Sequence, residues 1–368
     1  MIYFLLRLPQ LDTVNNLFTR LEPTMGDRLQ KLPYTDLFEM TIAPAGVYVF
    51  TGLDQLSKAQ TQAATQVCDR FRKDGSIVMN HPGRAMDRFE LLSTLHSLGL
   101  NEFRAFRAAE FEKMEATYPM FVRSNSQHTG PLSHLLRSPS EVKHAIRRAR
   151  LWGHADDDLL VVEYCHIQDE DGFFRKYSAF RIGDAIIPCY LEHGDDWHVK
   201  RTLSRPKAGA PDLADEELGF VQQNPHEIEL KRVFEIARIE YGRIDYAVRN
   251  GRLQVWEINS APSYGQSGRR RSQAREAERV ARFQARMTFI GNIREALDSL
   301  DASVEPGQTA VEFDQSLLVQ IRRDVHAERA FVRATRVRDA ARSMGLSRLG
   351  RLKMPLSWLL GRILNRLG

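Results

Sequence analysis

The pair Asn250–Gly251 divides one stretch of the sequence into two segments with β-strand character. YGRIDYAVR stands before the pair and RLQVWEIN follows it. Asn-Gly between two such segments is the strongest short-range signal for a β-hairpin, because both central positions of a type I′ turn need a positive φ. The sequence therefore predicts two antiparallel strands joined at this turn.

The predicted hairpin carries more polar side chains than a buried strand pair usually holds. Asp245 lies on the first strand, whereas Glu257 and Asn259 lie two residues apart on the second and project from one face. Pairing around the turn would bring Asp245 close to both. Two carboxylates and an amide oxygen are hard ligands of the kind that Mg²⁺ binds together with substrate phosphates. The alternative is that Arg243 and Arg252 form structural salt bridges with the carboxylates.

The rest of the chain predicts an α+β fold with an N-terminal α/β layer. Strands alternate with helices over residues 47–107, with one helix expected at 58–73, which favours a parallel sheet covered by helices. Mostly strands follow up to residue 194, with helices expected at 140–152 and 225–241. Beyond residue 268 the pattern is helical, with one apolar face recurring from Val280 to Leu300. Residues 1–45 are divided by prolines and give no clear assignment.

Composition and cysteine usage exclude several classes of protein. The chain has 43% hydrophobic and 27% charged residues, as ordinary globular proteins do. The apolar run before Arg7 is too short for a signal peptide, and no run approaches the eighteen or so residues of a membrane span. Cys68, Cys165 and Cys189 lack the spacing of a zinc site or a disulfide framework. We therefore expect a cytoplasmic protein with buried thiols.

The net charge of +5 is concentrated at the C-terminal end. Residues 342–368, the basic tail, hold six basic side chains and no acidic one, and the remaining residues sum to −1. We therefore expect no nucleic-acid partner for the body of the chain. Leucines at near-helical spacing in the basic tail suit an anionic membrane surface or an acidic partner. The alternative is a terminal helix that folds back on the body or pairs in a homodimer.

The hairpin resembles the closing segment of the ATP-grasp ligases, in particular the branch of D-alanine–D-alanine ligase, glutathione synthetase and RimK. YGRIDYAV followed by GRLQVWEINSAP has an Arg-x-Asp strand, a Glu-x-Asn strand and a loop with Pro and Gly. The resemblance implies Mg²⁺ ligation by Asp245, Glu257 and Asn259. It also implies that Arg243 faces a reacting acyl phosphate, and that the loop Ser260–Gly265 lends backbone N–H groups.

Further family elements occur in the expected order. DLLVVEY resembles the hinge strand between the two lobes, where backbone groups of Val162 and Tyr164 and the side chain of Glu163 would hold adenine. YPMFVRSNSQHTGP resembles the strand that ends in a basic phosphate ligand, here Arg123, followed by a loop over the phosphates. MDRFELLSTLHSLGL resembles the helix whose basic residue reaches ATP, here Arg88.

The two phosphate-contacting positions depart from the better-known members, which usually carry Lys there. Arg88 and Arg123 keep the positive charge, but an arginine fork binds phosphate differently from a point ammonium. The covering loop, residues 124–131, holds a single glycine, Gly130. Both departures bear on phosphoryl transfer more than on ATP binding.

A third basic ligand is expected on the segment FFRKYSAFRI. Of its basic residues Arg175, Lys176 and Arg181, Lys176 is assigned to phosphate, and a solvated face is the alternative. His128 in the covering loop and His198 in DDWHVKR are candidates for substrate contact, with a surface or structural role as the alternative.

The resemblance implies an ATP- and Mg²⁺-dependent ligase that joins a carboxylate to an amine through an acyl phosphate. The carboxylate and the amine belong to small molecules or peptides. The implied domains are a pre-grasp α/β domain over 1–110, an ATP-grasp domain over 111–268 with its hinge near 161–165, and a helical extension over 269–368. Two alternatives remain open: an ATP-binding sensor or scaffold without ligase chemistry, and a kinase of the same fold.

Overall fold

The computed structural model describes residues 1–113, 115–128, 130–199, 213–263, 276–301, 304–313 and 315–343. The chain forms two compact units, each built from several segments. Unit 1 comprises Met1–Leu56, Ala64–Glu102 and Cys165–Glu312, and unit 2 comprises Ser57–Ala63, Phe103–Tyr164 and Phe313–Gly368. One crossing between the units falls between Tyr164 and Cys165, inside the predicted hinge segment. The predicted division into 1–110, 111–268 and 269–368 stays a prediction.

A parallel sheet in unit 1 confirms the predicted N-terminal α/β layer. Residues 105–107, which the prediction placed in this layer, instead form a strand of unit 2 that pairs antiparallel with residues 160–162. The strands of the parallel sheet are β1 (Ile2–Leu6), β2 (Leu29–Pro33), β4 (Val47–Phe50) and β5 (Ile77–Met79), in the order β2-β1-β4-β5. β1 and β4 are almost wholly buried, as strands covered on both faces are. The connections contain α1 (Asn15–Met25), α2 (Tyr34–Leu37) and α3 (Lys58–Lys73), of which α3 has the bounds that the sequence predicts.

An antiparallel sheet in unit 1 contains the predicted hairpin. Its strands are β9 (Phe174–Ile182), β10 (Ala185–Gly194), β11 (Tyr241–Arg249) and β12 (Arg252–Asn259), in the order β10-β9-β11-β12. Asn250 and Gly251 have φ values of 50° and 71°, so the turn is the one that the Asn-Gly pair predicts. The α+β fold class is therefore confirmed.

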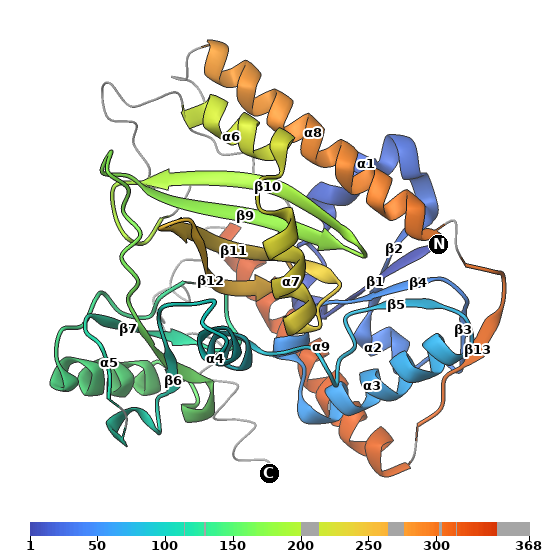
Figure 1. The fold of residues 1–368 in the computed structure, drawn as a ribbon. Helices are drawn as coiled ribbons and strands as arrows, with labels where there is room; N and C mark the ends of the chain where they lie inside the picture. The colour runs from blue at the N-terminus through green and yellow to red at the C-terminus, as the bar shows by residue number, and fades with distance from the viewer. Residues whose placement is uncertain are drawn as a thin grey trace. The chain divides into compact units, whose positions relative to one another are not determined.

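Helices pack on this sheet through a continuous apolar core. They are α4 (Arg88–Ser97), α6 (Leu213–Gln223), α7 (Glu227–Ala237) and α8 (Glu276–Asp301). Helices α6 and α8 lie side by side, and both contact β10 (Figure 1). The Tyr177 ring stacks on Tyr246 with centroids 5.4 Å apart and meets Phe220 of α6 edge-on at 5.1 Å. One buried cluster joins these residues to the parallel sheet.

Unit 2 has a small sheet and a core of its own. Its strands are β6 (Ala105–Arg107), β7 (Met120–Ser124) and β8 (Leu159–Glu163), in the order β6-β8-β7. Helix α5 (Pro139–Leu151) packs its apolar face on this sheet, and α9 (Gln315–Ser343) belongs to the same unit. The remaining pair of strands, β3 (Ile42–Pro44) and β13 (Gln308–Ala310), lies in unit 1.

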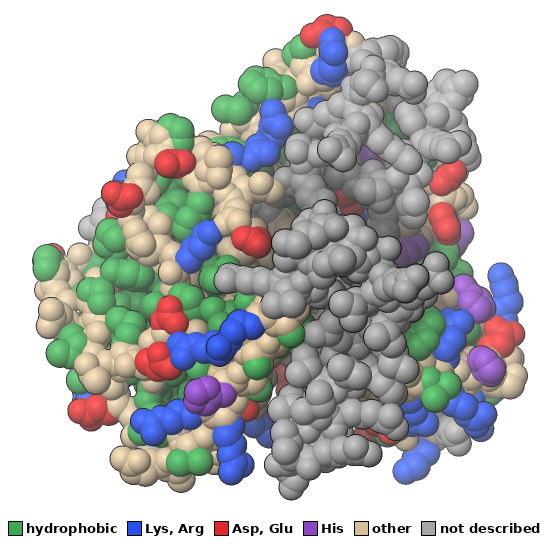
Figure 2. All heavy atoms as spheres, turned by 180° about the vertical axis from the view of Figure 1, so that it is seen from behind, with side chains coloured by type: hydrophobic (Ala, Val, Ile, Leu, Met, Phe, Trp, Pro, Cys, Tyr) green, Lys and Arg blue, Asp and Glu red, His purple; other side chains and the backbone are tan. Residues whose placement is uncertain are grey.

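Several surface features bear on the predictions about partners. Among the helices of the described residues, none combines the length and the apolar composition needed to cross a membrane. Basic and acidic side chains are interspersed on the face shown in Figure 2. Cys68, Cys165 and Cys189 are buried, as predicted. The basic tail lies outside the described residues from position 344 onward.

Candidate functional site

The antiparallel sheet brings the predicted metal ligands together on one face. In the ladder of β11 and β12, Asp245 is paired with Glu257, and Arg243 is paired with Asn259. Directly opposed residues of an antiparallel pair project from the same face. The predicted pairing around the Asn-Gly turn is therefore confirmed, and it places two carboxylates, an amide and a guanidinium side by side.

Cations surround Asp245. Arg243 Nε donates to Asp245 Oδ1 at 3.1 Å, and Ser178 Oγ donates to the same oxygen at 2.8 Å. Lys176 Nζ lies 3.5 Å from Asp245 Oδ2 and 2.7 Å from Glu192 Oε2. Ser178 and Glu192 were not identified from the sequence. In the ladder, Ser178 lies opposite Asp245, and Glu192 lies opposite Lys176.

These contacts set the charge states at neutral pH. Burial alone would raise the pKa of Asp245, but the charges of Arg243 and Lys176, helped by the Ser178 hydroxyl, hold that pKa below its ordinary value. Burial alone would lower the pKa of Lys176, but Asp245 and Glu192 raise it well above its ordinary value. Both groups are therefore ionised, so the site pairs full charges in a partly buried setting.

Arg88 reaches the same cluster from the start of α4. Asp87 caps this helix by accepting from the Glu90 N–H at 2.8 Å, and Glu90 accepts in return from the Asp87 N–H at 3.0 Å. This capping box fixes Arg88 as the first helical residue. Arg88 is buried, at 5% exposed, and its guanidinium forms an ion pair of 2.5 Å with Glu257 Oε2. A predicted phosphate ligand thus contacts a predicted metal ligand.

The donor set fits a magnesium ion that shares its coordination with phosphates. Asp245 and Glu257 supply carboxylate oxygens on one sheet face, and Asn259 Oδ1, held by the Ala261 N–H at 2.8 Å, supplies an amide oxygen. Among the described residues there is no group of three or more His, Cys, Asp and Glu side chains suited to a metal. A cation here would therefore depend on ligands from a bound substrate, which is the usual case for Mg²⁺.

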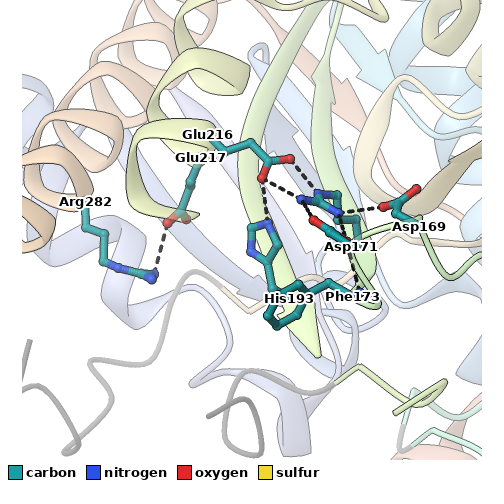
Figure 3. A network of polar contacts seen from close by, with 8 residues as sticks. Asp169, Asp171, Phe173, His193, Glu216, Glu217 and Arg282 are labelled. Carbon is teal, nitrogen blue, oxygen red and sulfur yellow. Dashed lines mark hydrogen bonds and ion pairs between the residues drawn. The ribbon is translucent and has the colours of Figure 1, made fainter. Parts of the chain in front are cut away.

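Arg175 and Arg181, the alternatives to Lys176, have structural partners. Arg175 forms ion pairs with Asp169, Asp171 and Glu216 at 2.8, 2.6 and 2.7 Å. His193 lies 3.1 Å from Glu216, and Figure 3 shows how this network joins the sheet to helix α6. Arg181 donates to two backbone carbonyls, those of Gly183 and Ile239. Of the three basic residues, Lys176 is the one in contact with a predicted metal ligand.

The predicted adenine-binding segment lies at the end of β8 in unit 2. Glu163 is buried, and its carboxylate accepts from Arg104 Nη2 at 2.6 Å, from the Arg104 N–H at 2.9 Å and from the Thr117 N–H at 2.8 Å. The Tyr164 N–H donates to the Pro119 carbonyl at 2.9 Å. The Glu163 side chain therefore has a structural role in unit 2 that the sequence did not reveal, and its contact to adenine stays a prediction.

The strand β7 carries Arg123 and leads into the covering loop. Arg123 is 8% exposed and pairs with Leu160 in the ladder of β7 and β8. Asp158 orders the start of the loop, since it accepts from Ser124 Oγ at 2.6 Å and from the Ser126 N–H at 2.8 Å. No motif surrounds Asp158, so its role in this loop has no local signature in the sequence.

The remaining predicted site residues lie in loops. His128 and His198 are both half-buried, and the His198 ring lies 5.7 Å from that of Trp197. In the loop Ser260–Gly265, Arg243 Nη1 donates to the Ser263 carbonyl at 3.4 Å, whereas residues 264 and 265 lie outside the described residues. Arg243 therefore bridges the metal-ligand face and this loop.

Replacing Lys176 by Met should lower the free energy of unfolding by about 3 kcal/mol, because a mostly buried ion pair would lose its cation. Urea denaturation measures this loss. Lys231→Met is a matched control, since the Lys231–Asp184 pair is exposed and should contribute less than about 1 kcal/mol. Equal losses in the two variants would contradict the interpretation.

The depressed pKa of Asp245 predicts how its contribution depends on pH. A carboxylate whose folded pKa lies below its unfolded value of about 3.9 contributes stability above that value, and loses it as the pH falls through the folded pKa. The difference in unfolding free energy between the wild type and Asp245→Asn should be constant from pH 5 to 7. Below about pH 4 it should shrink, by at most about 1.4 kcal/mol per pH unit. A difference that grows on acidification would refute the ionised state of Asp245.

Comparisons with known proteins give remote structural similarities. No family model and no curated protein matches the sequence. A D-alanine–D-alanine ligase from Bacillus anthracis is similar over 82% of this chain and 99% of its own, with 14% identity and a TM-score of 0.45. The ATP-grasp ligase PsnB, complexed with a minimal precursor, is similar over 81% and 98%, with 12% identity and a TM-score of 0.47.

An L-amino acid ligase from Bacillus licheniformis is similar over 83% of this chain and 77% of its own, with 12% identity and a TM-score of 0.39. Because the identities and the TM-scores are low, we base the functional proposal on the residues of this chain.

Proposed function

We propose that the protein is an ATP- and Mg²⁺-dependent ligase that joins a carboxylate to an amine through an acyl phosphate. The observation that carries this proposal is the ladder register that sets Asp245 opposite Glu257 and Asn259 opposite Arg243. A donor set for a hard cation thereby lies directly beside basic side chains. Phosphoryl transfer needs this combination, because its catalysis consists of positioning and charge stabilisation.

The charges of the cluster balance one another before any nucleotide binds. Arg88, Lys176 and Arg243 are the cations, and Asp245 and Glu257 with the neighbouring Glu192 are the anions. We assign Arg88 and Lys176 to the phosphates of ATP, and the two site carboxylates with Asn259 to Mg²⁺. Bound Mg²⁺ would supply positive charge shared between phosphate oxygens and carboxylates. When the nucleotide binds, the basic side chains would pair with phosphates and the carboxylates with Mg²⁺. Each buried charge would therefore keep a partner of opposite charge.

In the first half-reaction an oxygen of the substrate carboxylate attacks the γ-phosphorus, and the bond from that phosphorus to the bridging oxygen of ADP breaks. In the second an amine attacks the acyl carbon, and phosphate leaves with the former carboxylate oxygen. We assign Arg243 to the oxyanion of this step, because its Nε contacts Asp245 and its Nη1 contacts the Ser263 carbonyl. The products are an amide, ADP and phosphate.

Unit 2 is proposed to supply the remaining nucleotide contacts. Arg123 is assigned to phosphate, and backbone groups of Val162 and Tyr164 with the Glu163 side chain are assigned to adenine. Support comes from the ladder, which sets Arg123 and Val162 on adjacent strands, β7 and β8.

The test is ADP release from ATP and Mg²⁺ with pools of carboxylic acids and amines, followed by mass spectrometry of the product. We expect ADP release to need both a carboxylate and an amine, and the product mass to equal their sum less one water. With an ¹⁸O-labelled carboxylate, one labelled oxygen should appear in phosphate. A stable phosphorylated product would instead indicate a kinase, and ATP binding without ADP release would indicate a sensor or scaffold.

A further inference from the structure

Gln254 of β12 has one end of its side-chain amide unsatisfied. The residue is fully buried, at 0% exposed. Its Oε1 accepts from the Glu102 N–H at 2.9 Å and from the Cys165 thiol at 3.8 Å, whereas Nε2 has no hydrogen-bond partner among the described residues. If the amide were flipped, its NH₂ group would face the Glu102 N–H, which is also a donor. The hydrogen bond from Glu102 therefore determines the orientation of the amide. A buried donor without an acceptor is rare and costly in folded proteins.

A β-bulge sets Gln254 on the face of the predicted metal ligands. Asp245 pairs with Glu257, the register shifts between Asp245 and Tyr246, and Ala247 then pairs with Gln254. Asp245 and Ala247 alternate along β11 and share a face, so Gln254 shares the face of Glu257. In a regular strand, residues three positions apart would face opposite ways. The extra residue in β12 therefore brings this amide to the candidate site.

The Gln254 side chain is held rigidly. Asn101 forms two hydrogen bonds of 2.9 Å with the backbone of Val255, one to its carbonyl and one from its N–H. The same segment supplies the Glu102 N–H that fixes Gln254 Oε1. Gln254 Nε2 is thus preorganised, and binding of a ligand to it does not carry the entropic cost of ordering this side chain.

We infer that Gln254 Nε2 donates a hydrogen bond to a ring nitrogen of the ATP base, an inference that rests on the proposed function. Gln254 lies two ladder steps from the Asp245–Glu257 pair, about 7 Å along the strands. Cys165, whose thiol contacts the same amide, directly follows Tyr164 in the chain. Tyr164 is the last residue of the segment proposed for adenine. A purine ring nitrogen accepts without donating, which is what an isolated N–H requires.

The test compares the binding of ATP with that of its 1-deaza, 3-deaza and 7-deaza analogues, each of which lacks one ring nitrogen. Calorimetric titrations in Mg²⁺ give the dissociation constants for the wild type, for Gln254→Met and for the exposed control Gln308→Met. We expect the wild type and Gln308→Met to bind one of the three analogues about tenfold more weakly than ATP. Gln254→Met should bind ATP about tenfold more weakly and should not discriminate against that analogue.

Gln254→Glu is a second variant in case Gln254→Met does not fold, because it keeps an acceptor for the Glu102 N–H. It should show the same loss of discrimination. Discrimination that survives in the folded Gln254 variant, or that is absent in the wild type, would overturn the inference and leave the proposed function intact; Nε2 would then bind a buried water. Failure of the wild type to bind ATP at all would refute the proposed function and this inference with it.

Discussion

Asp245→Asn and Glu257→Gln should each reduce ATP turnover at least about 100-fold. Both substitutions keep the size of the side chain and remove its negative charge. The amide is a weaker ligand for a hard cation, and Lys176 and Arg88 lose the carboxylates with which they pair. The rate of ADP release, measured with the substrates that the library screen identifies, gives the effect.

Asp184→Asn is the matched control for these two variants. Asp184 lies on the exposed turn between β9 and β10, and its substitution likewise replaces a carboxylate by an amide. Its activity should equal that of the wild type. Circular dichroism and urea denaturation will show whether each variant is folded at the assay temperature. Full activity in a folded Asp245→Asn or Glu257→Gln protein would refute the metal-site assignment.

Glu163→Gln should lower the free energy of unfolding by about 3 kcal/mol, the second large effect that we expect. Burial alone would raise the pKa of Glu163, but hydrogen bonds from Arg104 and from the Thr117 N–H hold that pKa below its ordinary value. The carboxylate thus accepts, as an anion, from four donor nitrogens, three of Arg104 and one of Thr117. A glutamine would present an NH₂ group to some of these donors and would leave the Arg104 guanidinium without its charge partner.

Urea denaturation and amide hydrogen exchange in β6 and β8 would measure this effect. Glu110→Gln is the control in the same unit, because Glu110 is exposed, and it should change stability by less than about 0.5 kcal/mol. A Glu163→Gln protein of wild-type stability would contradict the structural role of this carboxylate. A loss of ATP affinity at unchanged stability would show that Glu163 acts on the nucleotide directly.

Local chemistry made the hairpin and much of the fold predictable. Asn250–Gly251 determines its turn through backbone conformation, and the turn then determines which residues of β11 and β12 face each other. Helix α3 follows from its own periodicity and has the predicted bounds. Helix α1 was missed because Pro23 lies inside it, where a helix is normally interrupted. Tertiary packing of Leu17, Leu21 and Met25 outweighs that preference.

The pairing of the site residues could not be predicted from the sequence, because the partners lie far apart along the chain. Arg88 meets Glu257 across 169 residues, and Lys176 meets Asp245 across 69. Neither pairing leaves a local signature, so the resemblance alone suggested that they share a site. The role of Gln254 depends on a single extra residue in one strand. A register shift of one residue moves every later side chain of the strand to the opposite face of the sheet. The sequence of β12 contains no pattern that predicts this shift.

Calorimetric titration of the protein with ATP, in Mg²⁺ and in excess EDTA, tests most directly whether the face that carries Asp245, Glu257 and Asn259 is a magnesium–nucleotide site. We predict binding in Mg²⁺ that weakens at least about tenfold in EDTA, and a Glu257→Gln protein whose affinity for ATP depends little on Mg²⁺. Equal affinity of the wild type in Mg²⁺ and in EDTA, or no binding in either, would contradict the assignment.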